Sequence, residues 1–326
     1  MKSFLEKTGK WILFFLLLAA VVVLICYYAA QSKETVDVIY ICKTEISSSD
    51  FWASVLSGAE MAAKENQVNL KIKCSPDELN VEMQNDLIYE SIAEKPDVIA
   101  VSVASRDANT QALRAVKEAG IGLIIIDSKA DEDIQDCVVT TDNIAAGRKM
   151  AEPMLPKLTP ESKIAIVAHV ENASTCVERI EGLLDGLGSY RDQVVDIVYS
   201  NAIADIGYKV TLDLLKREPD ISFIACTNED SAVGAARAVQ ELGLEKDILM
   251  VGFDSSPEEV VRLEEGVLDA IVVQKAFSMG YFGIESAAAL ARNEHIEHYI
   301  DSGSVLITKD NMYQEENQEV LFPFHD

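Results

Sequence analysis

Charged and amide side chains follow several predicted strands at the point where each strand ends. Residues 248–251 are four apolar residues in a row, which is typical of a strand that is buried on both faces. Gly252 is expected to let the backbone turn, and Asp254 then lies just past the carboxyl end of this strand. Open α/β sheets place their ligands at these ends. We therefore predict that such side chains converge on one polar small molecule, in a cleft between two lobes.

Strand-like and helix-like segments alternate along the chain from Val36 onward. This alternation indicates parallel sheets with helices on both faces, and two runs of similar length indicate two similar lobes. The C-terminal residues 314–326 receive no assignment. The predicted strands are 36–42, 68–73, 97–102, 121–126, 138–139, 163–168, 194–199, 221–226, 248–251 and 269–273, and the predicted helices are 51–66, 82–93, 109–118, 175–187, 205–217, 230–242, 257–265 and 277–291.

An uncharged apolar segment, residues 11–30, precedes the predicted lobes. As a helix it would be about 30 Å long, enough to span the hydrocarbon core of a bilayer. Residues 1–10 carry three lysines and one glutamate, which predicts a cytoplasmic N-terminus and an exported remainder. The segment is longer than the core of a cleaved signal, so we favour an uncleaved membrane anchor. The alternatives are cleavage of the segment, although no clean A-x-A site is present, and lipidation of Cys26, although Cys26 follows Ile25 instead of a small residue.

The composition excludes several classes of function. The net charge of −26 argues against a nucleic-acid partner, because neutralising phosphates requires a basic face. No CxxC pair occurs, and buried reduced thiols are favoured over a disulfide framework. His295 and His298 lack a surrounding ligand framework, so no metal site is predicted. No cofactor is expected, because no dinucleotide G-x-G-x-x-G, P-loop or HExxH motif is present. The six cysteines are Cys26, Cys42, Cys74, Cys137, Cys176 and Cys226.

Several short motifs follow one another in a characteristic order. They are Phe51-Trp52, Ile126-Asp127, Thr141-Asp142-Asn143, Glu178-Arg179-x-Glu181-Gly182, Thr227-Asn228-Glu229-Asp230, Val251-Gly252-Phe253-Asp254 and Val273-Gln274. This order resembles the type 1 periplasmic binding proteins, the ribose- and galactose-binding-like family, over roughly residues 36–312. The resemblance implies an α/β fold of two Rossmann-like lobes with parallel sheets, joined by three crossovers near Thr141, Gln274 and Asp301.

The same resemblance implies the boundaries of the lobes. The N-terminal lobe would comprise residues 36–141 and 275–301. The C-terminal lobe would comprise residues 142–274 and 302–312, which leaves residues 313–326 as a tail. The complete prediction places one transmembrane helix before this two-lobed fold.

The ligand-binding residues are also implied by the resemblance. Phe51 and Trp52 match the aromatic side chains that stack on a sugar ring. Asp127 matches the carboxylate of the first lobe, although many members have arginine after it where this chain has Ser128. Lys43 stands where a small polar residue is common. The full predicted set is Lys43, Phe51, Trp52, Asp127, Ser128, Arg179, Asn228, Asp254 and Gln274.

These residue types suit a sugar, which has an apolar C–H face and a rim of hydroxyl groups. Aromatic rings supply a platform, and carboxylates, amides and a guanidinium supply fixed hydrogen bonds. Each residue also has a structural alternative. The aromatic pair could be core, and Arg179 could pair with Glu178 or Glu181 on its own helix. Lys43 is either solvated or in contact with the ligand; contact would favour a sugar acid, a phosphorylated sugar or an open ketose.

The predicted function is that of a membrane-tethered, extracytoplasmic solute-binding protein. It would close on a sugar or sugar derivative and present the closed form to a membrane partner, either the permease of an ABC importer or a sensor kinase or chemoreceptor. A permanent anchor favours the sensor. The alternatives are the effector domain of a LacI-type regulator, which would need a DNA-binding motif where the apolar segment lies, and a glycoside-acting enzyme with Asp127 and Asp254 as its carboxyl pair.

Overall fold

The computed structural model describes residue 18, residues 35–44 and residues 50–322. The predicted anchor at residues 11–30 lies outside the described residues, except for Leu18. Among the described residues, no helix has the length and apolar character needed to cross a membrane. The chain divides into two compact units, Met1–Val36 and Asp37–Asp326, and the fold below is that of the second unit.

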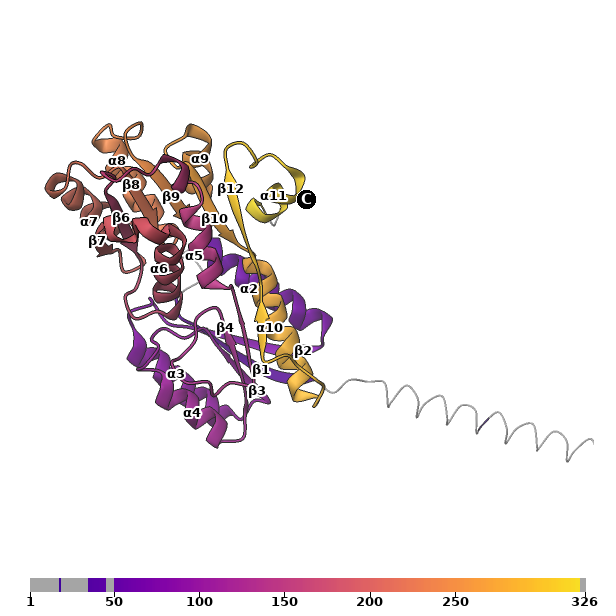
Figure 1. The fold of residues 1–326 in the computed structure, drawn as a ribbon. Helices are drawn as coiled ribbons and strands as arrows, with labels where there is room; N and C mark the ends of the chain where they lie inside the picture. Colours follow the sequence, from indigo (N-terminus) through magenta and orange to yellow (C-terminus); the bar gives the residue numbers. More distant parts are fainter. Residues whose placement is uncertain (1–17, 19–34, 45–49, 323–326) are drawn as a thin grey trace, which may run out of the picture. The chain divides into compact units, whose positions relative to one another are not determined.

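The first sheet has six strands in the order β11-β5-β4-β3-β1-β2 (Figure 1). Its central strands are rich in valine and isoleucine, and β3 and β4 are buried almost throughout, as expected for strands covered on both faces. Strands β1, β3, β4, β5 and β11 pair in parallel. The bounds are β1 Val36–Cys42, β2 Val68–Cys74, β3 Val98–Val101, β4 Gly122–Ile126, β5 Cys137–Thr140 and β11 Tyr299–Asp301.

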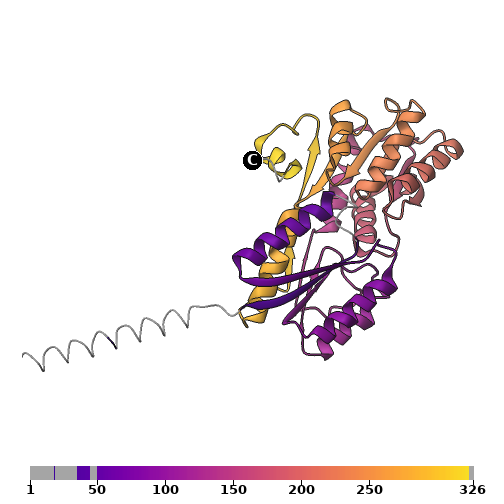
Figure 2. The same cartoon turned by 180° about the vertical axis from the view of Figure 1, so that it is seen from behind.

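Two pairs of helices cover the first sheet. Helices α3 (Val81–Glu94) and α4 (Thr110–Glu118) pack on one face through a cluster that includes Ile88, Leu113 and Ile125. Helices α2 (Asp50–Glu65) and α10 (Ala276–Ala291) lie side by side, and α10 contacts β3, β4 and β5 (Figures 1 and 2). Because successive strand residues point to opposite faces, each strand contributes to both layers.

The second sheet also has six strands, in the order β12-β10-β9-β8-β6-β7. One strand departs from the predicted parallel arrangement, since β12 runs antiparallel to β10. The order matches that of the first sheet, so β9 occupies the place of β4 and β10 that of β5. The bounds are β6 Ile164–Ala168, β7 Val194–Tyr199, β8 Phe223–Cys226, β9 Leu249–Phe253, β10 Ala270–Gln274 and β12 Ser304–Thr308.

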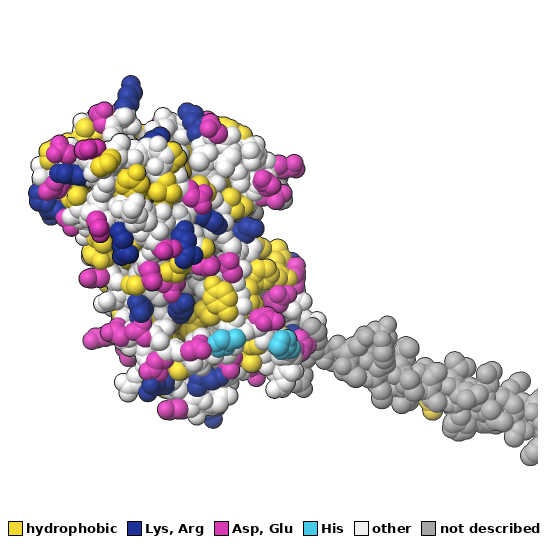
Figure 3. Space-filling model, viewed as in Figure 1, with side chains coloured by type: hydrophobic (Ala, Val, Ile, Leu, Met, Phe, Trp, Pro, Cys, Tyr) yellow, Lys and Arg dark blue, Asp and Glu magenta, His cyan; other side chains and the backbone are white. Residues whose placement is uncertain are grey.

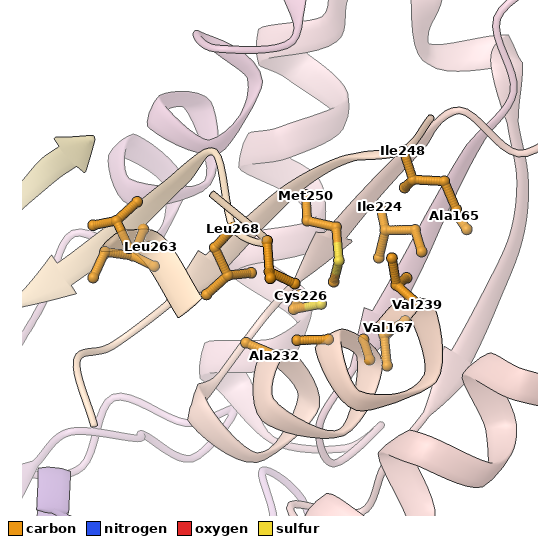
Figure 4. Close-up of a cluster of buried hydrophobic side chains, with 14 of the residues drawn as sticks. Ala165, Val167, Ile224, Cys226, Ala232, Val239, Ile248, Met250, Leu263 and Leu268 are labelled. Atoms are coloured by element: carbon orange, nitrogen blue, oxygen red, sulfur yellow. The ribbon is translucent and has the colours of Figure 1, made fainter. Parts of the chain in front are cut away.

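Helices also cover both faces of the second sheet. One face packs against α5 and α6, and the other packs against α7, α8 and α9. Figure 4 shows the apolar cluster between the sheet and helices α7, α8 and α9, which includes Val239 of α8 and Ile224 and Met250 of the sheet. The bounds are α5 Asn143–Ala151, α6 Ser174–Leu187, α7 Ala204–Arg217, α8 Glu229–Glu241 and α9 Pro257–Glu265, with 3-10 turns at Leu155–Lys157 and Gly188–Gln193.

The chain passes between the two sheets three times. It leaves the first sheet after β5, returns after β10 and crosses again between β11 and β12. The predicted α/β fold of two Rossmann-like lobes is therefore confirmed. Three elements were not predicted: strands β11 and β12, and helix α11 (Glu315–Leu321), whose Leu321 joins the core of the second lobe together with Met312.

One local prediction at the centre of the second lobe is wrong. Gly252 was expected to end the strand, but β9 continues through it to Phe253. Gly252 is closely packed, since a Cβ there would lie 3.1 Å from the side chain of Ile271. The backbone turns at Asp254 instead, where φ is +78°, and Asp127 after β4 has φ of +73°. Aspartate adopts this left-handed region more readily than most residues.

Candidate ligand-binding site

A cavity of about 170 Å³ lies where the strand ends of the two lobes meet. Its volume is below the roughly 300–1,000 Å³ of pockets for drug-sized ligands, so it suits one small molecule. Residues of both lobes line it, as the sequence predicts for a cleft between lobes. Eight of the nine predicted ligand-binding residues are among them: Lys43, Phe51, Trp52, Asp127, Arg179, Asn228, Asp254 and Gln274.

Ser128, the ninth predicted residue, does not line this cavity. Its side chain is fully buried, and its hydroxyl donates a hydrogen bond to the carbonyl oxygen of Val103 at 2.7 Å. The bend at Asp127 directs Asp127 and Ser128 to different surroundings. The assignment of Ser128 to the ligand is therefore corrected to a role in holding the loop after β4.

Lys43 is buried at the end of β1 and held by two carboxylates. Its Nζ lies 3.2 Å from Asp127 Oδ2 and 3.3 Å from Glu78 Oε2, and 5.4 Å from the ring centre of Trp52. Burial by itself lowers the pKa of Lys43, but Glu78 and Asp127 outweigh burial, so the pKa is raised above its ordinary value. Lys43 is therefore a charged wall residue whose charge is already neutralised by the protein.

Arg179 on α6 is the second buried cation of the cavity. Its Nε donates to Asn143 Oδ1 at 2.9 Å, its Nη1 donates to the carbonyl oxygen of Thr227 at 2.6 Å, and its guanidinium lies 3.7 Å from the ring centre of Phe253. Burial lowers the pKa of Arg179, and Asp254 partly opposes this. The alternative of a solvated pair with Glu178 or Glu181 is excluded, because Arg179 is only 3% exposed and bonded inward.

Asp254 and Gln274 form a bonded pair at the edge of the second sheet. Gln274 Nε2 donates to Asp254 Oδ1 at 2.7 Å. Burial raises the pKa of Asp254, while Arg179 and this hydrogen bond act against the rise. The other end of the amide, Gln274 Oε1, is buried and accepts no hydrogen bond within the described part of the chain. A buried acceptor of this kind is costly unless a ligand donates to it.

Asn228 lies in the wall formed by the start of α8. Its Oδ1 caps the helix by accepting from the backbone N–H of Ser231 at 3.0 Å. Asp230 follows two residues later and lines the same cavity. Its pKa is raised to about 7, first by burial and then by the carboxylates of Glu78 and Asp254, with a hydrogen bond to Asn228 acting against them.

The aromatic pair stands at the start of α2. Phe51 and Trp52 meet edge to face, with ring centres 5.0 Å apart, and both line the cavity. Trp52 is 3% exposed, so it belongs to the core as well as to the cavity wall. Helix α2 is fixed by close contact with α10: a Cβ at Gly280 would lie 1.8 Å from the carbonyl oxygen of Val55. This contact sets the position of the aromatic platform.

Several lining residues were missed by the sequence prediction. The most important are Glu78, which lies in the loop after β2, and His169, which follows β6. His169 contacts the hydroxyls of Thr227 at 2.7 Å and Thr175 at 3.0 Å. Burial, with the charges of Arg179 and Lys43, holds the pKa of His169 well below 6.5, so it is neutral at pH 7. The sequence did contain a clue to His169, because it directly follows strand β6. This strand is the counterpart of β1 in the other sheet, and Lys43 directly follows β1.

Direct contacts also join the two lobes. On one side Lys129 Nζ lies 2.8 Å from Glu178 Oε1, and the backbone N–H of Lys129 donates to Ser174 Oγ at 2.9 Å. At the crossovers the hydroxyls of Thr141 and Ser302 are 3.2 Å apart. The two lobes therefore touch both at the crossovers and between the loop after β4 and the start of α6.

A larger cavity of about 640 Å³ lies beside the crossover after β10 and helix α11. It shares Phe51, Asp254 and Gln274 with the first cavity, but Lys43 and Arg179 do not line it. Its walls combine apolar side chains, such as Phe277 and Leu321, with polar ones such as Glu316. The smaller cavity is the candidate site, because polar groups of both lobes converge there.

His295 and His298 each lie close to a carboxylate. His298 contacts Asp133 Oδ1 at 2.8 Å, which raises the pKa of His298. Throughout the region that the structure describes, no group of three or more histidine, cysteine or acidic side chains has the arrangement needed to hold a metal ion.

Comparison with known proteins defines the class to which this fold and site belong. A family model described as periplasmic binding protein domain matches residues 40–295, which is most of the chain. The chain therefore belongs to the periplasmic binding protein family, which confirms the resemblance found in its motifs. It is a binding protein and not an enzyme.

Individual relatives are similar along nearly the whole second unit. The ribose import binding protein RbsB of Escherichia coli (strain K12) is 23% identical over 82% of this chain and 88% of the relative. A sugar transporter from Clostridium phytofermentans is 40% identical, with a TM-score of 0.80 over 85% of this chain and 100% of that chain. A carbohydrate transporter solute binding protein from Agrobacterium radiobacter, in complex with D-arabinose, is 28% identical, with a TM-score of 0.83 over 89% and 100%.

Proposed function

We propose that this chain is an extracytoplasmic solute-binding protein that closes its two lobes on a neutral sugar or a closely related polyhydroxylated compound. The observation that carries the proposal is the set of acceptors around one small cavity. Asp127, Asp254 and the unsatisfied Gln274 Oε1 face a space lined by Phe51 and Trp52. Sugar hydroxyls donate to such acceptors, and the C–H face of a sugar packs on an aromatic ring.

The charges of the cavity favour a neutral ligand over an anionic one. Lys43 is paired with two carboxylates, and Arg179 is bonded to the protein through two of its nitrogens. Glu78, Asp127, Asp230 and Asp254 outnumber these two cations. A phosphate or carboxylate on the ligand would add a like charge to this group, which costs free energy in a buried site. The sugar acids and sugar phosphates considered for Lys43 are therefore disfavoured.

The membrane partner follows from the relatives and from the N-terminal segment. The relative RbsB is named a ribose import binding protein, and the solved relative is named a carbohydrate transporter solute binding protein. By analogy, this chain would deliver sugar to the permease of an ABC importer. Residues 11–30 are uncharged and long enough to span a bilayer, so an uncleaved anchor with the lobes outside the cytoplasm remains our proposal. A permanent anchor also suits a sensor kinase or chemoreceptor that reads the closed state.

The charge of the chain argues against a nucleic-acid partner. Figure 3 shows acidic and basic side chains interspersed over the face in view. The net charge is −26, and binding to phosphates requires the opposite sign. A small molecule and a membrane protein are therefore the proposed partners.

The proposal is tested by measuring ligand-dependent stability of the full chain in detergent. Neutral pentoses and hexoses, sugar acids and sugar phosphates are compared by thermal shift, and positive compounds are measured by calorimetry. A ligand at a hundred times its Kd should stabilise the folded state by about 2.7 kcal/mol. Asp254→Ala should abolish the shift, whereas Asp213→Ala, which changes an exposed carboxylate on α7, should retain it. A response to none of these sugars would contradict the proposal, and a response only to the anionic ones would contradict the neutral ligand.

A further inference from the structure

Two cysteines stand opposite each other at the ends of neighbouring strands. Strands β1 and β2 are adjacent in the first sheet and have equal lengths, Val36–Cys42 and Val68–Cys74. The backbone N–H of Ser75 donates to the carbonyl oxygen of Cys42 at 3.2 Å. In a parallel ladder this bond places Cys74 directly beside Cys42, so that both side chains leave the same face of the sheet.

The spacing of neighbouring strands suits a covalent link between these residues. Strands lie about 4.7–4.9 Å apart, within the 4.4–6.8 Å between Cα atoms that a disulfide requires. The pKa of Cys42 is raised, first by a hydrogen bond with the Cys74 thiol and then by burial, which agrees with the neighbouring positions that the strand pairing gives these two residues. Cys42 is fully buried and Cys74 is half-buried, so Cys74 is the one within reach of an oxidant.

We propose that Cys42 and Cys74 are a modification site that is oxidised to a disulfide. The Cys74 thiolate would attack a disulfide oxidant, either a low-molecular-weight disulfide or an exported thiol–disulfide oxidoreductase, and release one thiol. The Cys42 thiolate would then attack the sulfur of Cys74 and release the second thiol. The protein loses two electrons and two protons, and the oxidant gains them. Such bonds persist outside the cytoplasm, where we place these lobes.

The position of this pair ties it to the binding site. Cys42 directly precedes Lys43, and Cys74 begins the segment that carries Glu78 to within 3.3 Å of Lys43 Nζ. A disulfide would therefore tie together the end of β1, which carries Lys43, and the end of β2, which leads to Glu78. The other cysteines in the part of the chain that the structure describes are separate: Cys137 begins β5, Cys176 lies on α6 and Cys226 ends β8.

The test uses the full chain, equilibrated in oxidising or reducing glutathione buffer and then alkylated in denaturant. The reduced protein should present all six thiols, and the oxidised protein four, with the peptides that contain Cys42 and Cys74 joined in a tryptic digest. The midpoint of thermal unfolding should rise by about 5 °C on oxidation, because the bond closes the loop of residues 42–74. Sugar binding is not part of this readout, so it succeeds or fails independently of the proposed ligand.

Two variants separate this bond from other oxidation. Cys74→Ser changes only the half-buried member and should remove both the linked peptide and the rise in the unfolding midpoint. Cys137→Ser, in the same sheet, should keep both. Six reactive thiols under the oxidising condition, or a linked pair that includes any other cysteine in place of Cys42 or Cys74, would overturn the proposal.

Discussion

Replacement of Asp230 by asparagine tests the crowding of carboxylates in the ligand-free cleft. Asp230 lines the cavity together with Glu78 and Asp254, and its pKa is raised to about 7 by burial and by these two neighbours. Asparagine has nearly the same size and keeps a hydrogen-bond acceptor, but it cannot ionise. The variant therefore removes the titration of Asp230 and leaves the shape of the wall almost unchanged.

The raised pKa fixes the sign of the effect. In the unfolded chain Asp230 has the ordinary value of 3.8, so the folded protein keeps this proton to higher pH than the unfolded chain does. The preference of the folded state for protonated Asp230 contributes to the free energy of unfolding. This contribution is complete below about pH 4 and is lost as the pH rises through about 7. Between pH 5 and pH 8 the wild-type chain should lose about 2–3 kcal/mol through Asp230 alone. The asparagine variant should not lose this amount.

The assay is urea unfolding of both proteins without sugar, at pH 5 and at pH 8. The stability of Asp230→Asn relative to the wild type should increase by about 2–3 kcal/mol from the lower to the higher pH. Asp213→Asn, on the exposed side of α7, serves as the control and should show no such change. A difference between Asp230→Asn and the wild type that is equal at the two pH values would refute the argument that burial and neighbouring carboxylates perturb Asp230.

Three further substitutions test the parts of the site separately. Arg179→Lys should weaken sugar binding by about 100-fold in calorimetry, because lysine cannot reproduce two directed hydrogen bonds of a buried fork; unchanged affinity would remove Arg179 from the site. Gly280→Ala should lower the free energy of unfolding, measured in urea, by about 1–3 kcal/mol, because the alanine Cβ would overlap the carbonyl of Val55. The control Glu285→Ala, on the exposed side of α10, should have little effect. Lys129→Met removes a partly exposed ion pair between the lobes, so affinity should fall by only a few-fold, and a loss above tenfold would show that this pair controls closure.

The fold was predictable because the apolar runs and turn residues that define its strands and helices can be recognised in short stretches of sequence. Runs such as residues 121–126 are apolar and rich in isoleucine, and the structure buries them in β4. The alternation of strands and helices, with the carboxyl ends of strands on one edge, placed Asp127 and Asp254 at the cleft from sequence alone. Gly252 shows the limit of local inference, because glycine suggests a turn. Here the strand continues, and the small size of glycine is favoured by the close packing of the Ile271 and Glu259 side chains, which are tertiary contacts.

The composition of the site was less predictable than its location. Glu78 lies in a loop whose sequence has no periodic pattern, and only the folded chain brings it to Lys43. Ser128 was assigned to the ligand because it stands where many family members have arginine after the aspartate. The backbone at Asp127 is left-handed, and the Ser128 hydroxyl bonds to Val103 instead of lining the cavity. Helix α11 joins the second lobe through residues at the very end of the described chain. Each of these outcomes depends on contacts between segments far apart in sequence.

The distribution of charge within each lobe bears on the proposed opening and closing of the cleft. Asp127 and Asp254 occupy equivalent places after β4 and β9, and the backbone N–H of each donates at 2.9 Å to the next strand, to Val139 and Val272. Lys43 neutralises Asp127 within the first lobe, while Arg179 of the second lobe favours the charged form of Asp254. Separation of the lobes therefore leaves neither carboxylate without its own cation. An uncompensated buried charge is strongly destabilising. If the lobes move as we propose, this arrangement would let them separate without breaking a buried ion pair, and hydrogen bonds to the ligand would then favour the closed form.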